Sequence, residues 1–292
     1  MAVVTKAASE RMYLKPVYVP NYLVSVLILL TLCVSIYCGF IIDQLPDYSA
    51  YTTVLLFVLS FVISVFVTPK NFTVGFLTSL LPYMIGWRIG AMNDIVLMMA
   101  VAPLALIGFI FQFIDCARND WVHYKDDAWF GNLQWQVAFI QIYFGFNWTG
   151  HFTEKLFAGT ASFHHLEQVF FNYGLTSNTT TFVIIGGLVE LSIAIGIGMG
   201  LFTRLAGFGG LAYVMVANFF GGHFFNGYTW NSKPNGGWEY ILLMVVFFGS
   251  FMLSGSGKFS IDRWLISRDL MPKFLLPLCL TKAGRELYYP KK

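Results

Sequence analysis

The chain has 292 residues, of which 57% are hydrophobic and 11% charged. A soluble globular protein carries about 25% charged and about 45–50% apolar residues, so this chain has too little charge to cover one or two water-soluble domains. Its 30 Phe, 15 Tyr and 8 Trp exclude an intrinsically disordered chain. The composition therefore predicts an all-α integral membrane protein with the lipid bilayer as its first partner. Nucleic-acid binding is not expected, because the basic residues form no stripe with interleaved aromatic residues.

Eight apolar segments are long enough to predict transmembrane helices, because about 30 Å of hydrocarbon requires roughly 20 apolar residues. They cover residues 22–42, 50–68, 72–91, 95–114, 134–151, 181–201, 205–222 and 239–254. The first segment continues at full length without a small-residue cleavage site, so no cleavable signal peptide is expected.

The basic residues test this count independently. With the N-terminus in the cytoplasm, 15 Lys and Arg residues fall on the inner side, and three (Arg88, Lys155 and Lys233) fall on the outer side. Cytoplasmic segments of membrane proteins carry such an excess of Lys and Arg. The asymmetry predicts a multi-pass protein of the plasma or inner membrane with both termini in the cytoplasm.

Residues 115–133 form the most polar stretch before the C-terminal tail and predict a linker on the inner face. The expected organisation is a cytoplasmic N-terminus (1–21), an N-terminal four-helix region (22–114), this linker, a C-terminal four-helix membrane domain (134–266) and a basic cytoplasmic tail (267–292). Gly, His, Asn and Glu concentrate in the second half, so function is expected there.

Glu190 is the most costly residue in the predicted spans. It lies nine residues after the start of segment 181–201, which places it about 13 Å deep at 1.5 Å per residue. An ionisable group inside a membrane costs roughly 2.5–3.5 kcal/mol and normally faces a partner or a hydrated cavity. A proton-exchanging carboxylate is one interpretation, and a protonated Glu that only packs is the other.

Polar groups at the outer ends of the predicted spans indicate a mouth above Glu190. His151 ends the fifth segment, His223 ends the seventh, and Lys155 lies beyond the fifth. Glu190, His223, His151 and Lys155 are therefore the candidate catalytic residues, with proton transfer as the expected chemistry. Their spacing matches no known metal site, so a hydrogen-bonded polar mouth is favoured over a metal centre.

The loop from His223 to Tyr240 is rich in turn-forming and aromatic residues. Tyr228, Trp230 and Trp238 fit either an aromatic belt at the membrane interface or an apolar pocket for a quinone ring. Both interpretations stay open. Arg204 and Asp262, near the inner ends of their spans, are expected to pair or to cap neighbouring helix ends.

Several motifs of the second half together resemble the DoxX family of four-helix membrane proteins. They include Gly145, Gly150 and Lys155, the segment GGLVELSIAIGIGMGLFTRLAG, His223 and the segment LSGSGKFSIDRWL. The residues that match the family pattern are Lys155, Gly187 with Glu190, Thr203 with Arg204, and Gly255, Gly257, Ser260 and Asp262. The resemblance covers residues 134–266. This chain departs from the family in its four extra N-terminal spans and in the five-residue spacing from Gly150 to Lys155.

The resemblance implies a four-helix bundle with membrane redox chemistry, as in the thiosulfate:quinone oxidoreductase to which the archaeal DoxD relatives belong. Electrons would pass from a small sulfur reductant to quinone, directly or through a partner's cofactor, since the chain has no haem, flavin or iron–sulfur signature. Two alternatives remain. One is a non-catalytic structural or assembly subunit of a larger membrane complex, and the other is a proton-coupled transporter. Other membrane subunits or further copies of the chain are the expected protein partners.

Overall fold

The computed structural model describes residues 15–123, 128–230, 236–282 and 284–285, and all regular elements within these residues are helical. The long helices are α2 (Asn21–Ile36), α3 (Asp47–Phe66), α4 (Phe72–Met92), α5 (Val96–His123), α6 (Ala128–Asn147), α9 (Thr179–Ile193), α10 (Thr203–Phe220) and α11 (Glu239–Ser254). The shorter helices are α7 (Thr149–Leu156), α8 (Thr160–Asn172) and α12 (Ile261–Ser267). Two π-helical turns, η2 (Tyr37–Ile41) and η3 (Ala194–Gly198), continue α2 and α9, and η4 (His223–Asn226) and η5 (Lys273–Leu278) are 3₁₀ turns.

Each of the eight predicted apolar segments coincides with helix, so the all-α fold class is confirmed. In the described part of the chain, four helical segments are long and apolar enough to cross a membrane, namely Asn21–Ile41, Asp47–Phe66, Val96–Asp120 and Thr179–Gly198. α11 is a shorter apolar helix. Large apolar side chains such as Leu55, Phe111 and Val246 are more than half exposed on the helix exteriors. A surface of this kind suits lipid rather than water.

The N-terminal helices α2–α5 pack together through neutral polar contacts as well as apolar ones. The hydroxyls of Ser25 and Ser64 lie 2.8 Å apart between α2 and α3. The Tyr83 hydroxyl on α4 donates to the Ala102 carbonyl on α5 at 2.6 Å, and it lies 3.1 Å from the Thr31 hydroxyl on α2. Small hydroxyl residues let helices approach closely, and their hydrogen bonds need no charge.

The C-terminal helices approach each other through glycine. A Cβ on Gly145 of α6 would lie 2.0 Å from the Gly198 nitrogen of η3, so these backbones are in direct contact. A Cβ on Gly210 of α10 would lie 2.1 Å from the Phe248 ring of α11. This close packing is typical of helix pairs in membranes.

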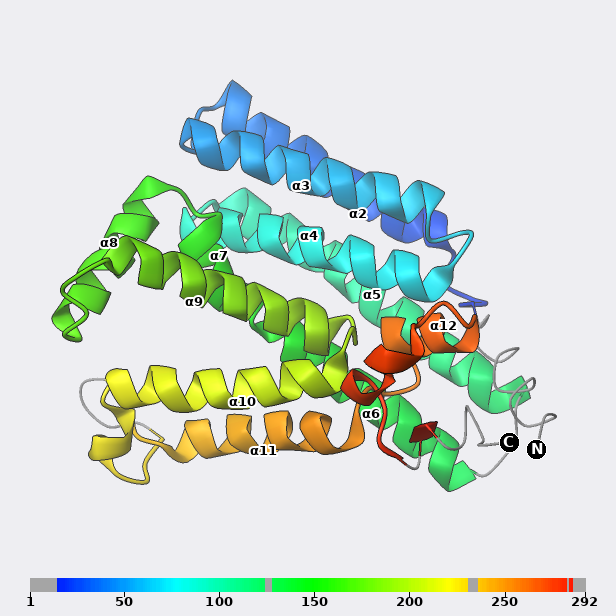
Figure 1. Cartoon of the computed structure of the whole chain (residues 1–292). Helices are drawn as coiled ribbons and strands as arrows, with labels where there is room; N and C mark the ends of the chain where they lie inside the picture. The colour runs from blue at the N-terminus through cyan, green and yellow to red at the C-terminus, as the bar shows by residue number, and fades with distance from the viewer. Residues whose placement is uncertain (1–14, 124–127, 231–235, 283, 286–292) are drawn as a thin grey trace.

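The two helix groups share one hydrophobic core and are joined near both ends. An ion pair connects Arg88 of α4 with Glu154 of α7, and these two helices lie side by side (Figure 1). A second ion pair joins Asp120 of α5 to Lys258, in the segment before α12. The neighbouring Phe259 packs against four aromatic rings of the other elements, those of Phe72, Phe76, Phe113 and Trp135.

The predicted linker 115–133 is largely helical. α5 extends to His123 and α6 begins at Ala128, so only residues 124–127 lie outside the described helices. The polar residues of this stretch are accommodated by specific partners. Asp115 accepts hydrogen bonds from the Tyr18 and Val19 amides, and Asp120 accepts one from the Trp135 indole at 2.6 Å. Polarity here marks helix–helix contacts rather than a loop.

Candidate functional site: a buried ion pair between α7 and α9

A lysine and a glutamate form an ion pair inside the C-terminal helices. Lys155, in the last turn of α7, and Glu190, on α9, are 9% and 4% exposed. The Lys155 Nζ donates a hydrogen bond to Glu190 Oε1 at 3.1 Å and lies 2.9 Å from Oε2. Both charges are therefore withdrawn from solvent and compensate each other.

A tyrosine from a third helix completes the site. The Tyr213 hydroxyl of α10 donates to Glu190 Oε1 at 2.7 Å, and Lys155 Nζ also donates to the His151 carbonyl at 3.2 Å. Glu190 Oε2 has no hydrogen-bond partner among the described residues. This oxygen is held by charge alone and keeps the capacity to accept a further proton or hydrogen bond.

Two glycines of α9 make room for the lysine. A Cβ on Gly187 would lie 2.9 Å from Lys155 Cβ and 2.7 Å from Leu156 Cγ. A Cβ on Gly186 would lie 3.7 Å from Lys155 Cε and 3.4 Å from the Tyr213 hydroxyl oxygen. The Lys155 side chain therefore runs across the glycine face of α9 to reach Glu190.

Further charged groups surround this pair. His151 is exposed, its ring packs on Trp148 at 5.3 Å between centroids, and it lies within electrostatic reach of Glu190, Lys155, Glu154 and Arg88. Arg88 and Glu154 pair beside it with about a third of each side chain exposed. The result is one connected group of charges that extends from the buried pair toward the accessible His151.

The structure brings together three of the four candidate catalytic residues. The prediction that Glu190 faces the interior is confirmed. The placement of Lys155 at an outer mouth above Glu190 was wrong, because α7 continues the fifth segment beyond His151 and carries Lys155 into the bundle. His223 lies beyond the end of α10, in η4 and ten residues after Tyr213, and its Nδ1 lies 3.3 Å from the Gly236 carbonyl oxygen.

Sequence reasoning missed Tyr213 and the role of Arg88. Tyr213 is a polar aromatic residue in the otherwise apolar stretch of α10, and such a residue could have been weighed as a partner for a buried carboxylate. Arg88 was predicted as an outer basic residue without a partner, and in the structure it pairs from α4 with Glu154 of α7. Neither partner is readable from spacing, since both contacts join residues far apart in the chain.

The three candidate quinone-binding residues lie in the loop between α10 and α11. The rings of Tyr228 and Trp238 are 4.5 Å apart between centroids, and Trp230 packs edge-on against Tyr240 at 5.6 Å. Tyr228 and Trp230 are both more than half exposed. Because these rings contact each other, they leave no slot between them for a planar ligand. Residues 231–235 of this loop lie outside the described residues.

Arg204 and Asp262 cap helix ends, as predicted. Asp262 accepts hydrogen bonds from the Phe202 and Thr203 amides at the start of α10. Arg204 donates to three carbonyls, those of Met252, Pro277 and Leu280. Burial raises the pKa of Asp262, and the bonds from Thr203 and Phe202 partly oppose this. Both residues fasten neighbouring helix ends together.

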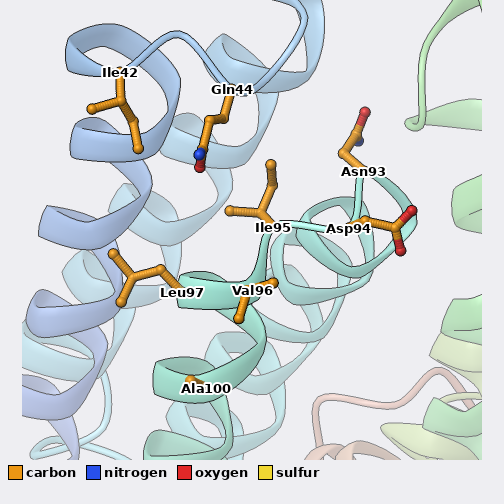
Figure 2. A pocket seen from close by; sticks show the side chains of 8 residues that line it. All are labelled: Ile42, Gln44, Asn93, Asp94, Ile95, Val96, Leu97 and Ala100. Atoms are coloured by element: carbon orange, nitrogen blue, oxygen red, sulfur yellow. The ribbon is translucent and has the colours of Figure 1, made fainter.

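A hollow of about 530 Å³ lies on the N-terminal helices instead. Figure 2 shows its lining, which comes from the segment after η2 and from the α4–α5 turn with the start of α5. None of its lining residues belongs to α7, α9 or α10, so this hollow is separate from the ion pair.

Comparisons with protein-family models, curated proteins and solved structures find no match to this chain.

Proposed function

We propose that this chain is an eight-span membrane protein in which the Lys155–Glu190–Tyr213 site exchanges protons during quinone-linked redox chemistry. Residues 134–266 form its DoxX-like bundle, and both termini are cytoplasmic. The observation that carries the proposal is the buried ion pair between apolar helices.

The energetic cost of this pair favours a function over a packing role. Two buried charges lose their hydration, and replacing such a pair by apolar residues of similar volume is often neutral or stabilising. Ionisable residues inside membrane bundles accordingly mark proton or substrate paths. A lysine and a glutamate at 9% and 4% exposure are therefore poor choices for stability alone.

In this proposal each residue of the site has its own role. Lys155 stabilises the Glu190 carboxylate, Tyr213 fixes Oε1 by hydrogen bonding, and Oε2 is the atom where a proton is taken up or released. His151 is exposed, its carbonyl accepts a hydrogen bond from Lys155 Nζ, and it serves as the next group toward the exterior in this proposal. A quinone supplies coupled electron and proton uptake. The rings of Tyr228 and Trp238 pack on each other, and Trp230 packs on Tyr240, so these pairs form no slot for it.

The eight-span topology is supported by the way the outer basic residues are used. Two of the three, Arg88 and Lys155, form ion pairs within the helix bundle rather than lying in loops. The outer loops then retain Lys233, which sharpens the excess of basic residues on the cytoplasmic side.

The DoxX-like interpretation is supported by the clustering of the matching residues. Lys155, Gly187 and Glu190 meet at the ion pair. Thr203 and Asp262 meet at the inner end of α10. A small sulfur reductant, and association with other membrane subunits or further copies, are parts of this proposal that rest on the resemblance.

A non-catalytic subunit of a membrane complex is the second candidate. It is favoured by the enclosure of Lys155, which is 9% exposed and donates to Glu190 and to the His151 carbonyl. In that case the ion pair joins α7 to α9, and neither residue changes its protonation state during function.

One experiment tests the proposal. The full chain is purified in mild detergent with its native neighbours, its bound quinone is extracted and its quinone-linked turnover is measured against pH. We expect Glu190→Gln to abolish turnover or its pH dependence, because the amide keeps the shape but carries no titratable proton. The single substitution leaves the Lys155 charge buried without a partner and lowers stability, so Lys155→Met/Glu190→Gln, which removes both charges, is measured beside it. Ser192→Ala, an exposed site on the same helix, is the matched control. Normal turnover in Glu190→Gln, or a stoichiometric partner without quinone, would favour the structural subunit.

A further inference from the structure

We infer that Arg88 and Glu154 are positioning residues, through which the N-terminal helices hold α7 so that Lys155 meets Glu190. This inference gives the four N-terminal helices a role, and it rests on the proposed function of the ion pair. The inference is based on the Arg88–Glu154 ion pair between α4 and α7.

α7 depends on its neighbours for its orientation. It has eight residues, is separated from α6 by Trp148, and ends before a turn in which Gly159 has a φ of 94°. So short a helix is not stable by itself and is held by packing. α7 packs against α9 on the site side and against α4 on the other.

The two ion pairs of α7 arise from adjacent residues. Glu154 and Lys155 point about 100° apart on the helix, so Glu154 reaches α4 while Lys155 reaches α9. Gly150, one turn before Glu154, lies beside the Arg88 side chain, since a Cβ there would be in ordinary contact with Arg88 Nε at 3.9 Å. The position of α7 is thus fixed from both sides by charge.

The charges alternate in sign along this contact, in the order Arg88, Glu154, Lys155 and Glu190. Without Arg88, Glu154 becomes a second carboxylate next to Lys155 and competes with Glu190 for its ammonium group. The titratable and charged groups that face Glu190 are Lys155 and His151 from α7 and Tyr213 from α10, with Glu154 and Arg88 beyond them. A change at Arg88 is therefore expected to weaken the Lys155–Glu190 pair.

Infrared spectroscopy of the purified full chain tests this inference without an activity assay. We expect Arg88→Gln to show a protonated-carboxyl band at neutral pH that the unaltered protein lacks. The band should be absent from Arg88→Gln/Glu190→Gln, which assigns it to Glu190. Arg88→Lys, which keeps the charge, should remove most of the band. The charge exchange Arg88→Glu/Glu154→Arg should likewise lack most of the band, because no carboxylate then lies next to Lys155 on α7. Arg88→Ala replaces Arg88→Gln if the latter fails to fold, and it should show the same Glu190 band.

Trp135→Phe is the matched control, because it removes a hydrogen bond to Asp120 at the other junction of the two helix groups. It is expected to lower stability without producing the Glu190 band. The same band in Trp135→Phe, or no band in folded Arg88→Gln, would overturn the positioning role. Failure of the proposed function is seen separately, as unchanged turnover in Glu190→Gln.

Discussion

The N-terminal and C-terminal helices bury polar groups in different ways. α2–α4 bury hydroxyls, such as those of Thr31, Ser60 and Tyr83, whose hydrogen bonds are made without charge. The buried carboxylates of the N-terminal group, Asp115 and Asp120, lie in the last third of α5. The C-terminal helices bury a lysine and a glutamate, which pair at 2.9 Å between Nζ and Oε2. Hydroxyls in an apolar interior cost little once hydrogen-bonded, whereas ions lose far more hydration.

Buried polar groups serve two purposes in this molecule. A neutral hydrogen bond fixes the relative position of two helices, as Tyr83 does for α4 and α5. A buried ion pair does this inefficiently, since an apolar contact would serve as well. What the charged pair adds is a group that can change its protonation state.

The largest effect is expected from Lys155→Met. Loss of one partner leaves the other charge buried without compensation, which costs about 3–5 kcal/mol. The free energy of unfolding in mixed micelles measures the change. Lys155→Met/Glu190→Gln should recover most of the loss, because the amide is neutral and still accepts from Tyr213. A loss in Lys155→Met no larger than that of a neutral hydrogen bond would erase the distinction between the two regions.

A second test adds a methyl group to the glycine face of α9 that Lys155 crosses. Gly187→Ala places a methyl group 2.7 Å from Leu156 Cγ and 2.9 Å from Lys155 Cβ, and such overpacking typically costs about 1–3 kcal/mol. Gly209→Ala is the matched control, because a Cβ there meets nothing within 4 Å. It should stabilise α10 by about 0.5–1 kcal/mol through helix propensity. Equal effects of the two substitutions would contradict the close approach of α7 to α9.

The sequence predicted the helices well because long apolar segments have few alternatives to helix in a membrane protein. All eight segments are helical, and the ends of several are marked by local signals such as the Asn71 cap of α4 and the positive φ of Gly255 after α11. The break at Trp148 and the length of α5 were not predicted. Both depend on tertiary contacts, including those that bury Asp115 and Asp120 in α5.

The site was predicted in part. Glu190 is recognisable because a carboxylate in an apolar segment is costly whatever surrounds it. Its partners Lys155 and Tyr213 lie 35 and 23 residues away in the chain, so only the packing of three helices reveals them. The sequence placed Lys155 and His223 together at an outer mouth, because both follow the ends of predicted spans. In the structure Lys155 pairs with Glu190, and His223 contacts Gly236.

A third test measures the neutral side of the comparison. Tyr83→Phe removes the hydrogen bonds to Ala102 and Thr31 but keeps the ring, and we expect a loss of about 1 kcal/mol. The free energy of unfolding is measured in the same micelles as for Lys155→Met, so the stability losses of the two variants can be compared directly. A loss for Tyr83→Phe as large as that for Lys155→Met would show that burial, rather than charge, determines the cost.

The smallest effect is expected from Glu167, a charged residue of α8 at the exposed end of the C-terminal helices. The Thr180 hydroxyl donates to Glu167 Oε1 and His164 Nδ1 lies 2.7 Å from Oε2, and these bonds hold the pKa of Glu167 below its ordinary value of 4.5.

Because the folded pKa is lowered, this contact is fully present above pH 4.5 and is lost as the pH falls through the lowered value. We expect α8 amides to exchange hydrogen faster over that range, after correction for intrinsic rates. Glu167→Gln has no carboxyl group to titrate and should remove the pH dependence. Exchange in α3 should stay constant over the same range, because its buried polar contacts are neutral hydroxyls. Equal acceleration in α3 would indicate global loosening rather than titration of one carboxylate.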